Sequence, residues 1–141
     1  IDILLAPTGD NSDSWPCTLR HIAREGRIFV VGTNACLHGR DVPRDLPGAA
    51  ELYPGDDDDW MSRGNTMIAG PDGDVLAGPL IGEPGMVTAS LPMDDIVRAR
   101  RQFDPTGHYA RPDVFTLAVH QPPTAWPGPD PEPLLVPAAL P

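Results

Sequence analysis

The first 34 residues contain two short apolar runs separated by an amphipathic pattern, and this feature constrains the fold more than any other. The runs are IDILLAP at 1–7 and RIFVVGTN at 27–34, and both are typical of buried strands. Four apolar residues of the segment between them fall on one helical face: Trp15, Leu19, Ile22 and Ala23. A strand, a helix and a strand in so short a span predict a βαβ unit whose two strands are parallel and adjacent.

Both ends of the predicted helix carry recognisable signals. Ser14 or Asp13 can cap its start near Trp15, and Pro16 is tolerated in the first turn because the N–H that proline lacks has no helical partner there. Gly26 is placed to end the helix.

The middle of the chain is expected to be mostly loop. Residues 37–63 show no periodicity and include four consecutive aspartates at 56–59. We expect a solvated surface loop and not a calcium site, because the aspartates lack the alternating ligand spacing of an EF-hand loop. Two apolar segments around Pro-Asp-Gly-Asp then predict a hairpin over 65–80.

Three further elements and a tail are predicted after the hairpin. GMVTASL at 85–91 and VFTLAV at 114–119 are typical of strands, and a helix is expected from about Pro92 to Gln102. We expect residues 1–120 to belong to one domain and the proline-rich stretch 121–141 to be a disordered tail.

The composition of the 141-residue chain excludes several classes of function. A net charge of −10 argues against electrostatic binding to nucleic acid or anionic lipid. No apolar run approaches the roughly 20 residues of a membrane-spanning helix, and no signal stretch opens the chain, so we expect a soluble cytoplasmic protein. Cys17 and Cys36 are too few for a disulfide framework and are expected to be free thiols.

Four blocks occur in order along the chain: LLAPTGDNSDSW, HIAREGRIFVVGTN, RGNTMIAGPDGDVLAGPL and FDPTGHYARPDVF. Together they resemble the C-terminal part of nitrilases, which are carbon–nitrogen hydrolases, from residue 1 to about 119. The resemblance implies an α/β fold, namely the C-terminal part of an αββα sandwich with a mixed sheet. It also implies dimers that grow into spirals, so we expect a homo-oligomer or an N-terminal partner segment.

The resemblance further implies hydrolysis of a nitrile to a carboxylic acid and ammonia. Such enzymes use a cysteine thiolate as nucleophile, a glutamate as general base and a lysine that stabilises negative charge, without metal or cofactor. In the family these residues lie upstream of the block that begins LLAPT, and all 10 basic residues of this chain are arginines. We therefore expect a portion of a nitrilase whose triad lies upstream of Ile1.

Two other functions stay open from the sequence. The chain could be an inactive truncated remnant that retains only assembly surfaces, or part of an amidase-type carbon–nitrogen hydrolase. A catalytic pair of Cys17 and His21, four residues apart at a helix start, is conceivable because the helix dipole lowers a thiol pKa there. We expect both cysteines to be inert, because two residues on one helix leave no oxyanion donors beside a reacting atom.

Candidate site residues follow the predicted strand ends. Thr8, Trp15 and Asn34 stand just past these ends, where open α/β sheets place their sites, and the resemblance makes them candidates to border the substrate pocket. Capping and packing explain them equally well. Glu25 and Arg27 are expected to form a structural ion pair at the helix end.

The segment GHYARPDVF at 107–115 concentrates polar residues before an apolar run. His108 is a further candidate for the substrate pocket. Four neighbours are predicted to be structural: Tyr109, Arg111, Pro112 and Asp113. Arg111 offers a planar fork for a carboxylate, Pro112 fixes the backbone, and Asp113 can cap or pair locally. An influence of this segment on specificity is the alternative.

Overall fold

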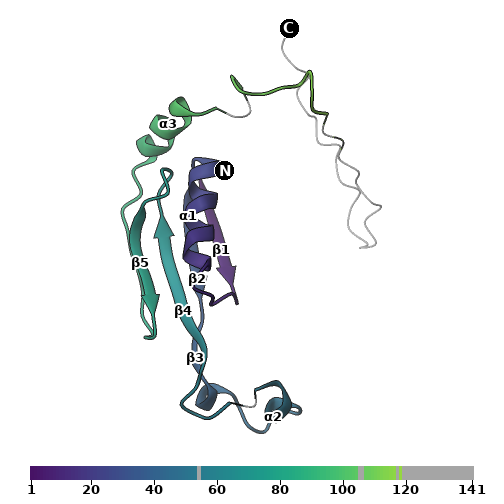
Figure 1. Ribbon diagram of the computed structural model, residues 1–141. Coiled ribbons are helices and arrows are strands. Elements are labelled where there is room, and N and C mark those ends of the chain that lie inside the picture. Colours follow the sequence, from purple (N-terminus) through teal and green to yellow (C-terminus); the bar gives the residue numbers. More distant parts are fainter. Residues whose placement is uncertain (54, 105–106, 117, 119–141) are drawn as a thin grey trace, which may run out of the picture. The chain divides into compact units, whose positions relative to one another are not determined.

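The computed structural model describes residues 1–53, 55–104, 107–116 and 118. The chain divides into two compact units, Ile1–Tyr109 and Ala110–Pro141. Among the described residues, every helix and strand belongs to the first unit. Figure 1 follows these elements along the chain.

The predicted βαβ unit is confirmed. Strand β1 (Ile3–Thr8) and strand β2 (Phe29–Asn34) are parallel neighbours, and helix α1 (Trp15–Gly26) connects them. The register pairs Ile3 with Phe29 at one end and Thr8 with Asn34 at the other. Both strands therefore end at the same edge of the sheet.

The predicted hairpin is also confirmed and completes a mixed sheet. Strand β4 (Trp60–Ala69) runs antiparallel to strand β5 (Val75–Ile81), and its second half runs antiparallel to β2. Strand β3 (Cys36–His38) follows β2 after one residue and pairs with the first half of β4. β2 and β3 thus occupy the same edge of β4 in succession, as Figure 1 shows.

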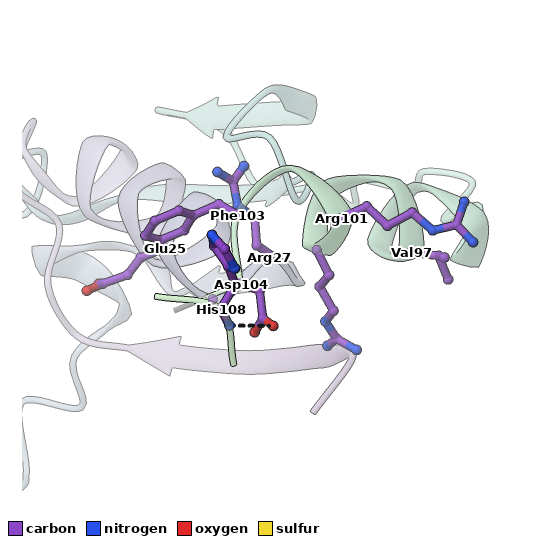
Figure 2. A pocket seen from close by; sticks show the side chains of 9 residues that line it. Glu25, Arg27, Val97, Arg101, Phe103, Asp104 and His108 are labelled. Carbon is purple, nitrogen blue, oxygen red and sulfur yellow. Dashed lines mark hydrogen bonds between the residues drawn. The ribbon is translucent and has the colours of Figure 1, made fainter. Parts of the chain in front are cut away.

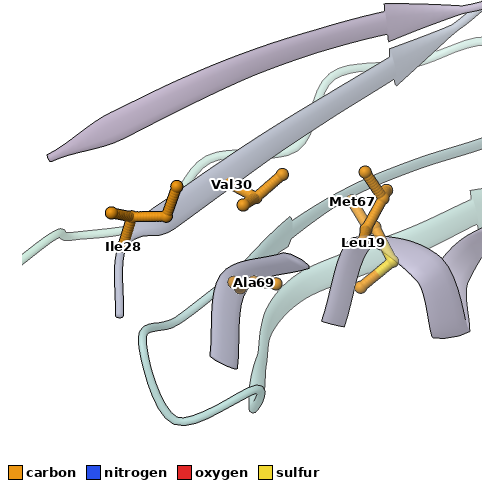
Figure 3. Packing of buried hydrophobic residues seen from close by; sticks show 6 residues of the cluster. Leu19, Ile28, Val30, Met67 and Ala69 are labelled. Carbon is orange, nitrogen blue, oxygen red and sulfur yellow. The ribbon is translucent and has the colours of Figure 1, made fainter. Parts of the chain in front are cut away.

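Helix α1 lies over one face of the sheet and forms the core with it (Figure 3). The buried cluster comprises Leu19, Ala23, Ile28, Val30, Met67 and Ala69. Gly32 allows the close approach, since a Cβ there would lie 2.3 Å from Cδ1 of Leu19. The apolar stripe of α1 predicted from the sequence is therefore the contact between helix and sheet.

The ends of α1 differ from prediction in detail. Ser14 is the N-cap residue but makes no capping bond, because its hydroxyl pairs with that of Ser12 at 2.9 Å. The helix ends at Gly26 as expected, yet the left-handed residue is Arg27, with φ of 50°. Its backbone N–H closes the last turn on the carbonyl of Ala23.

Arg27 does not pair with Glu25 as predicted. Its guanidinium contacts Asp72 at 3.4 Å, while Glu25 lies 3.4 Å from His21. The reason is the position of the β4–β5 turn, which brings Asp72 against the end of α1. Arg98 of helix α3 (Met93–Gln102) approaches the same carboxylate at 4.0 Å.

Two loop and strand predictions were wrong. Residues 37–63 are not one loop, since they contain most of β3, a 3₁₀ turn (Gly39–Asp41), helix α2 (Ala49–Leu52) and the start of β4. Local pattern missed β3 because its pairing is with residues far along the chain. Residues 85–91 form neither strand nor helix, and no described strand pairs with them.

The described part of the second unit is a short turn. The Arg111 guanidinium donates two hydrogen bonds, of 2.8 and 2.7 Å, to the Asp113 carboxylate. The planar shape of the guanidinium predicted such a contact. The amides of Val114 and Phe115 both donate to the carbonyl of Arg111. These turn hydrogen bonds contradict the strand predicted at 114–119. Residues 117 and 119 of that segment, His120 and the predicted tail at 121–141 lie outside the described residues.

Candidate functional site

Thr8 and Asn34 meet at the carboxyl edge of β1 and β2, where they are register partners. Thr8 accepts a hydrogen bond from the amide of Asp10 at 3.0 Å. The Asn34 backbone exchanges two bonds with the hydroxyl of Thr66, at 3.1 and 3.3 Å. The edge therefore carries a connected set of polar groups from β1, β2 and β4.

Three asparagine side chains fasten the loop that follows β1, which spans residues 9–14 and is called the edge loop below. Asn34 donates to the carbonyl of Asp10 at 2.7 Å, and Asn65 donates to the carbonyl of Ser12 at 2.9 Å. Asn11, within the loop, donates to the carbonyl of Met61 at 3.0 Å. The edge loop is thus tied to β2 and to both halves of β4.

The β4 backbone is unusual where it meets this loop. Gly64 and Asn65 have φ values of 100° and 94°, a region that favours glycine. A Cβ on Gly64 would lie 2.9 Å from the carbonyl oxygen of Leu80. Asn65 is buried, with 2% of its surface exposed. The bend turns its amide towards the edge loop.

Inside the loop, Asp10 folds back on Ser12. The hydroxyl and the backbone N–H of Ser12 lower the pKa of the Asp10 carboxyl below its ordinary value of 3.8, and the N–H bond is 2.9 Å long. Asp10 is therefore a carboxylate at neutral pH. Its hydrogen bonds shape the loop rather than prepare a general acid.

Two of the three predicted residues at this edge have a buried polar atom without a hydrogen-bond partner. The atoms are the indole Nε1 of Trp15 and Oδ1 of Asn34. Buried donors and acceptors are satisfied in most native structures, so unpaired ones point to a ligand, a water molecule or a neighbouring chain. The indole N–H is a donor and the amide oxygen is an acceptor.

A small cleft of about 190 Å³ opens beside Asn34. Its lining includes Cys36, Thr66 and Glu83. The Cys36 thiol is half-buried, and Cys17 is exposed in the first turn of α1; neither is in a disulfide. The imidazole of His21 lies beside Glu25 instead of bonding to Cys17. The described residues therefore contain no hydrogen-bonded thiol–imidazole pair.

His108 lies elsewhere. It lines a groove with Glu25 and Arg27 at the end of α1, together with Phe103 and Asp104, as Figure 2 shows. Trp15 begins the same helix, which rises about 1.5 Å per residue, so the two positions are a helix length apart. The structure brings Thr8, Asn34 and the start of α1 together, and does not bring His108 to them. Its ring packs edge-on against Tyr109.

Sequence reasoning missed the polar groups that β4 supplies to the edge. Asn65 and Thr66 were assigned only to a hairpin strand. The pair Gly64–Asn65 was the available signal, because a glycine beside an asparagine within a strand pattern marks a bulge or a left-handed bend.

The described residues contain no group of three or more His, Cys, Asp or Glu side chains placed to hold a metal ion. Among the helices described, none combines the length and apolar character needed to cross a bilayer.

Comparison with known proteins finds several nitrilases that are similar to this chain along most of its length. It is 44% identical over 123 residues to an aliphatic nitrilase of Sinorhizobium fredii, covering 87% of this chain and 39% of the relative. It is 40% identical to an arylacetonitrilase of Trametes versicolor, covering 86% and 38%, and 40% identical to nitrilase 2 of Arabidopsis thaliana, covering 87% and 37%.

The chain thus spans less than two fifths of the length of these curated relatives. The family model for carbon–nitrogen hydrolases matches residues 2–101, which include β1 through most of α3. The sequence blocks, the mixed sheet and these matches agree: the chain belongs to the carbon–nitrogen hydrolase family.

Proposed function

We propose that this chain is a portion of a nitrilase that hydrolyses a nitrile to a carboxylic acid and ammonia. The catalytic cysteine, glutamate and lysine would lie upstream of Ile1. The observation that carries the proposal is the similarity, over 84% or more of the chain, to relatives named as aliphatic nitrilase, arylacetonitrilase and nitrilase.

The residues of the chain support a catalytic triad that lies upstream of it. With no lysine among its 10 basic residues, it offers no ammonium side chain to stabilise an anion at the nitrile nitrogen. The exposed Cys17 and the half-buried Cys36 have no imidazole base among the described residues. The chain's contribution is then the scaffold and one side of the substrate pocket.

Thr8, Trp15 and Asn34 are the proposed pocket residues. Thr8 and Asn34 lie at the carboxyl edge of parallel strands, which is where open α/β sheets place ligands, and Trp15 begins α1 directly after the edge loop. The unpaired atoms of Trp15 and Asn34 would donate to and accept from polar groups that enter the pocket. The aliphatic or aromatic part of the nitrile would pack on the indole ring.

The free side of β1 supports a partner segment. Ile3 and Leu5 are 42% and 70% exposed, while the alternate residues Leu4 and Ala6 pack on the core cluster. β1 also has β2 as its only partner among the described strands. We propose that an N-terminal segment, or a second copy in a homo-oligomer, covers these apolar side chains.

The test is a fusion enzyme. The N-terminal part of the Sinorhizobium fredii aliphatic nitrilase, up to its match with Ile1, is joined to this chain, and ammonia release is measured from a nitrile and from the corresponding amide. A second fusion with the donor's nucleophilic cysteine changed to alanine is the control. We expect ammonia from the nitrile, only with the cysteine present.

Two other results would decide against the proposal. Release of ammonia from the amide alone would indicate an amidase-type hydrolase. A folded fusion that is inactive on both substrates would indicate a remnant that has kept assembly surfaces without supporting catalysis. Circular dichroism and size-exclusion chromatography establish whether the fusion is folded.

A further inference from the structure

Among the described residues, Asn65 is the buried polar side chain that reaches from β4 into the edge loop. Its surface is 2% exposed, and its amide nitrogen lies 2.9 Å from the carbonyl oxygen of Ser12, 53 residues away in the sequence. Removing a buried hydrogen-bond partner costs more than an exposed one, since the group left behind has no water to replace it. This contact is therefore a strong restraint on the loop.

The backbone of Asn65 is held in a conformation that few residues adopt. Its φ of 94° follows a φ of 100° at Gly64, and the pairing of β4 with β5 shifts register at the same place. Outliers of this kind persist where surrounding structure demands them and cluster at functional sites. In this strand the bend directs the side chain at Ser12.

Ser12 in turn sets the start of α1. The backbone N–H of Trp15 donates to the carbonyl of Ser12 at 3.1 Å, so one carbonyl oxygen accepts from both Trp15 and Asn65. Trp15 carries the unpaired indole N–H of the proposed pocket. A displacement at Asn65 would therefore be transmitted through one shared acceptor to the pocket indole.

We infer that Asn65 is a positioning residue: it fixes the edge loop and the Trp15 indole, and through them the selectivity of the pocket among nitriles. It does not touch the reacting atoms. The inference rests on the proposed nitrilase function for its catalytic consequence, and on the chain alone for the restraint of the loop.

The first experiment measures the restraint in the folded fusion enzyme. Asn65→Asp keeps the shape of the side chain but replaces the amide donor with an oxygen that faces the Ser12 carbonyl. Ser62→Ala is the matched control, because Ser62 is 8% exposed, lies in the same strand and bonds the carbonyl of Ala35 at 2.6 Å, outside the loop. We expect hydrogen exchange of the Ser12 and Trp15 amides to accelerate about tenfold in Asn65→Asp. In Ser62→Ala it should not change.

The second experiment measures the consequence in the fusion enzyme. The ratio of kcat/KM for a small aliphatic nitrile to that for an arylacetonitrile is compared between the two variants. Misplacement of a positioning group by about 1 Å can cost on the order of a hundredfold in rate, so we expect the ratio to change by about tenfold or more in Asn65→Asp alone.

The outcomes separate the two claims. Equal exchange rates in both variants would overturn the restraint, and a loosened loop with an unchanged ratio would overturn the role in selectivity. If Asn65→Asp fails to fold, Asn65→Gly replaces it, since glycine adopts the same φ without the amide. A fusion with wild-type Asn65 that is inactive on every nitrile contradicts the proposed function itself, whatever the exchange rates.

Discussion

The two sides of β1 are built from similar side chains but lie in different surroundings. Leu4 and Ala6 point towards α1 and pack on a cluster that includes fully buried Leu19. Ile3 and Leu5 point the other way, and Leu5 remains 70% exposed. An exposed apolar row beside a packed one shows that side-chain chemistry alone does not define a core; a covering element does.

The largest difference should appear between truncation of a leucine in the core that the packed side of β1 contacts and truncation of a leucine on the exposed side. Leu19→Ala removes a side chain with no exposed surface and is expected to lower the free energy of unfolding by about 2–5 kcal/mol. Leu5→Ala should change it by less than about 0.5 kcal/mol. Urea titrations followed by circular dichroism measure both. Similar losses would mean that Leu5 is covered in solution, and a dependence on protein concentration would identify a second copy as the cover.

Substitution of two glycines compares a packed position with an open one without removing apolar surface. Gly32→Ala would place a methyl group 2.3 Å from Leu19 Cδ1, so overpacking should cost about 1–3 kcal/mol. Gly9→Ala, with nothing within 4 Å, should be close to neutral. Thermal unfolding of the two variants makes the comparison. A neutral Gly32→Ala would show that α1 can move away from the sheet, against the packing described.

A smaller difference is expected when a partly buried ion pair is compared with an exposed one. Asp72→Ala deprives Arg27, whose side chain is 14% exposed, of its carboxylate partner, and should cost about 1 kcal/mol. Asp58→Ala breaks a pair with Arg40 that is 87% and 54% exposed, and should cost less than about 0.5 kcal/mol. Chemical denaturation in low and in high salt measures both. The reverse order would mean that the turn at Asp72 is held by its backbone alone.

The smallest effect belongs to an exposed ion pair in the second unit. Two hydrogen bonds from Arg111 lower the pKa of Asp113 below 3.8. A depressed carboxyl pKa stabilises the folded form above the unfolded value, and this contribution is lost as the pH falls through the folded value. Because more than half of each side chain is exposed, the contribution to stability is too small to detect. The measurable change is in the NMR titration of Asp113, whose midpoint should rise towards 3.8 in Arg111→Gln; an unchanged midpoint would contradict the bidentate contact.

The sequence predicted those elements whose pattern is local. The apolar stripe of α1, the two buried strands and the Pro-Asp-Gly-Asp turn all depend on residues within one element, and each was located close to its observed bounds. β3 is three residues long and depends on β4 for its pairing, so no local pattern could have found it. Residues 85–91 have the composition of a strand but no partner among the described strands. The lack of a partner is visible only once the whole sheet is known.

The candidate site was predicted in part for the same reason. Thr8 and Asn34 follow from strand ends, and parallel pairing brings them together. Asn65 depends on a bend in a strand and a contact to Ser12 that has no signature in nearby residues. His108 was grouped with them by resemblance, and the structure places it in the groove beside Glu25.

Strand β4 is the only described strand with three partners, because β2 and β3 share one of its edges and β5 lies along the other. The contacts with β2 and β3 join residues far apart along the chain, whereas β5 follows β4 directly in a hairpin. Because long loops must close before β2 and β3 can pair with β4, the β4–β5 hairpin is expected to form before the rest of the sheet. A one-residue insertion should be tolerated in the long connection between β3 and β4, at 39–59, but not within β4, where it would shift the pairing with three strands at once.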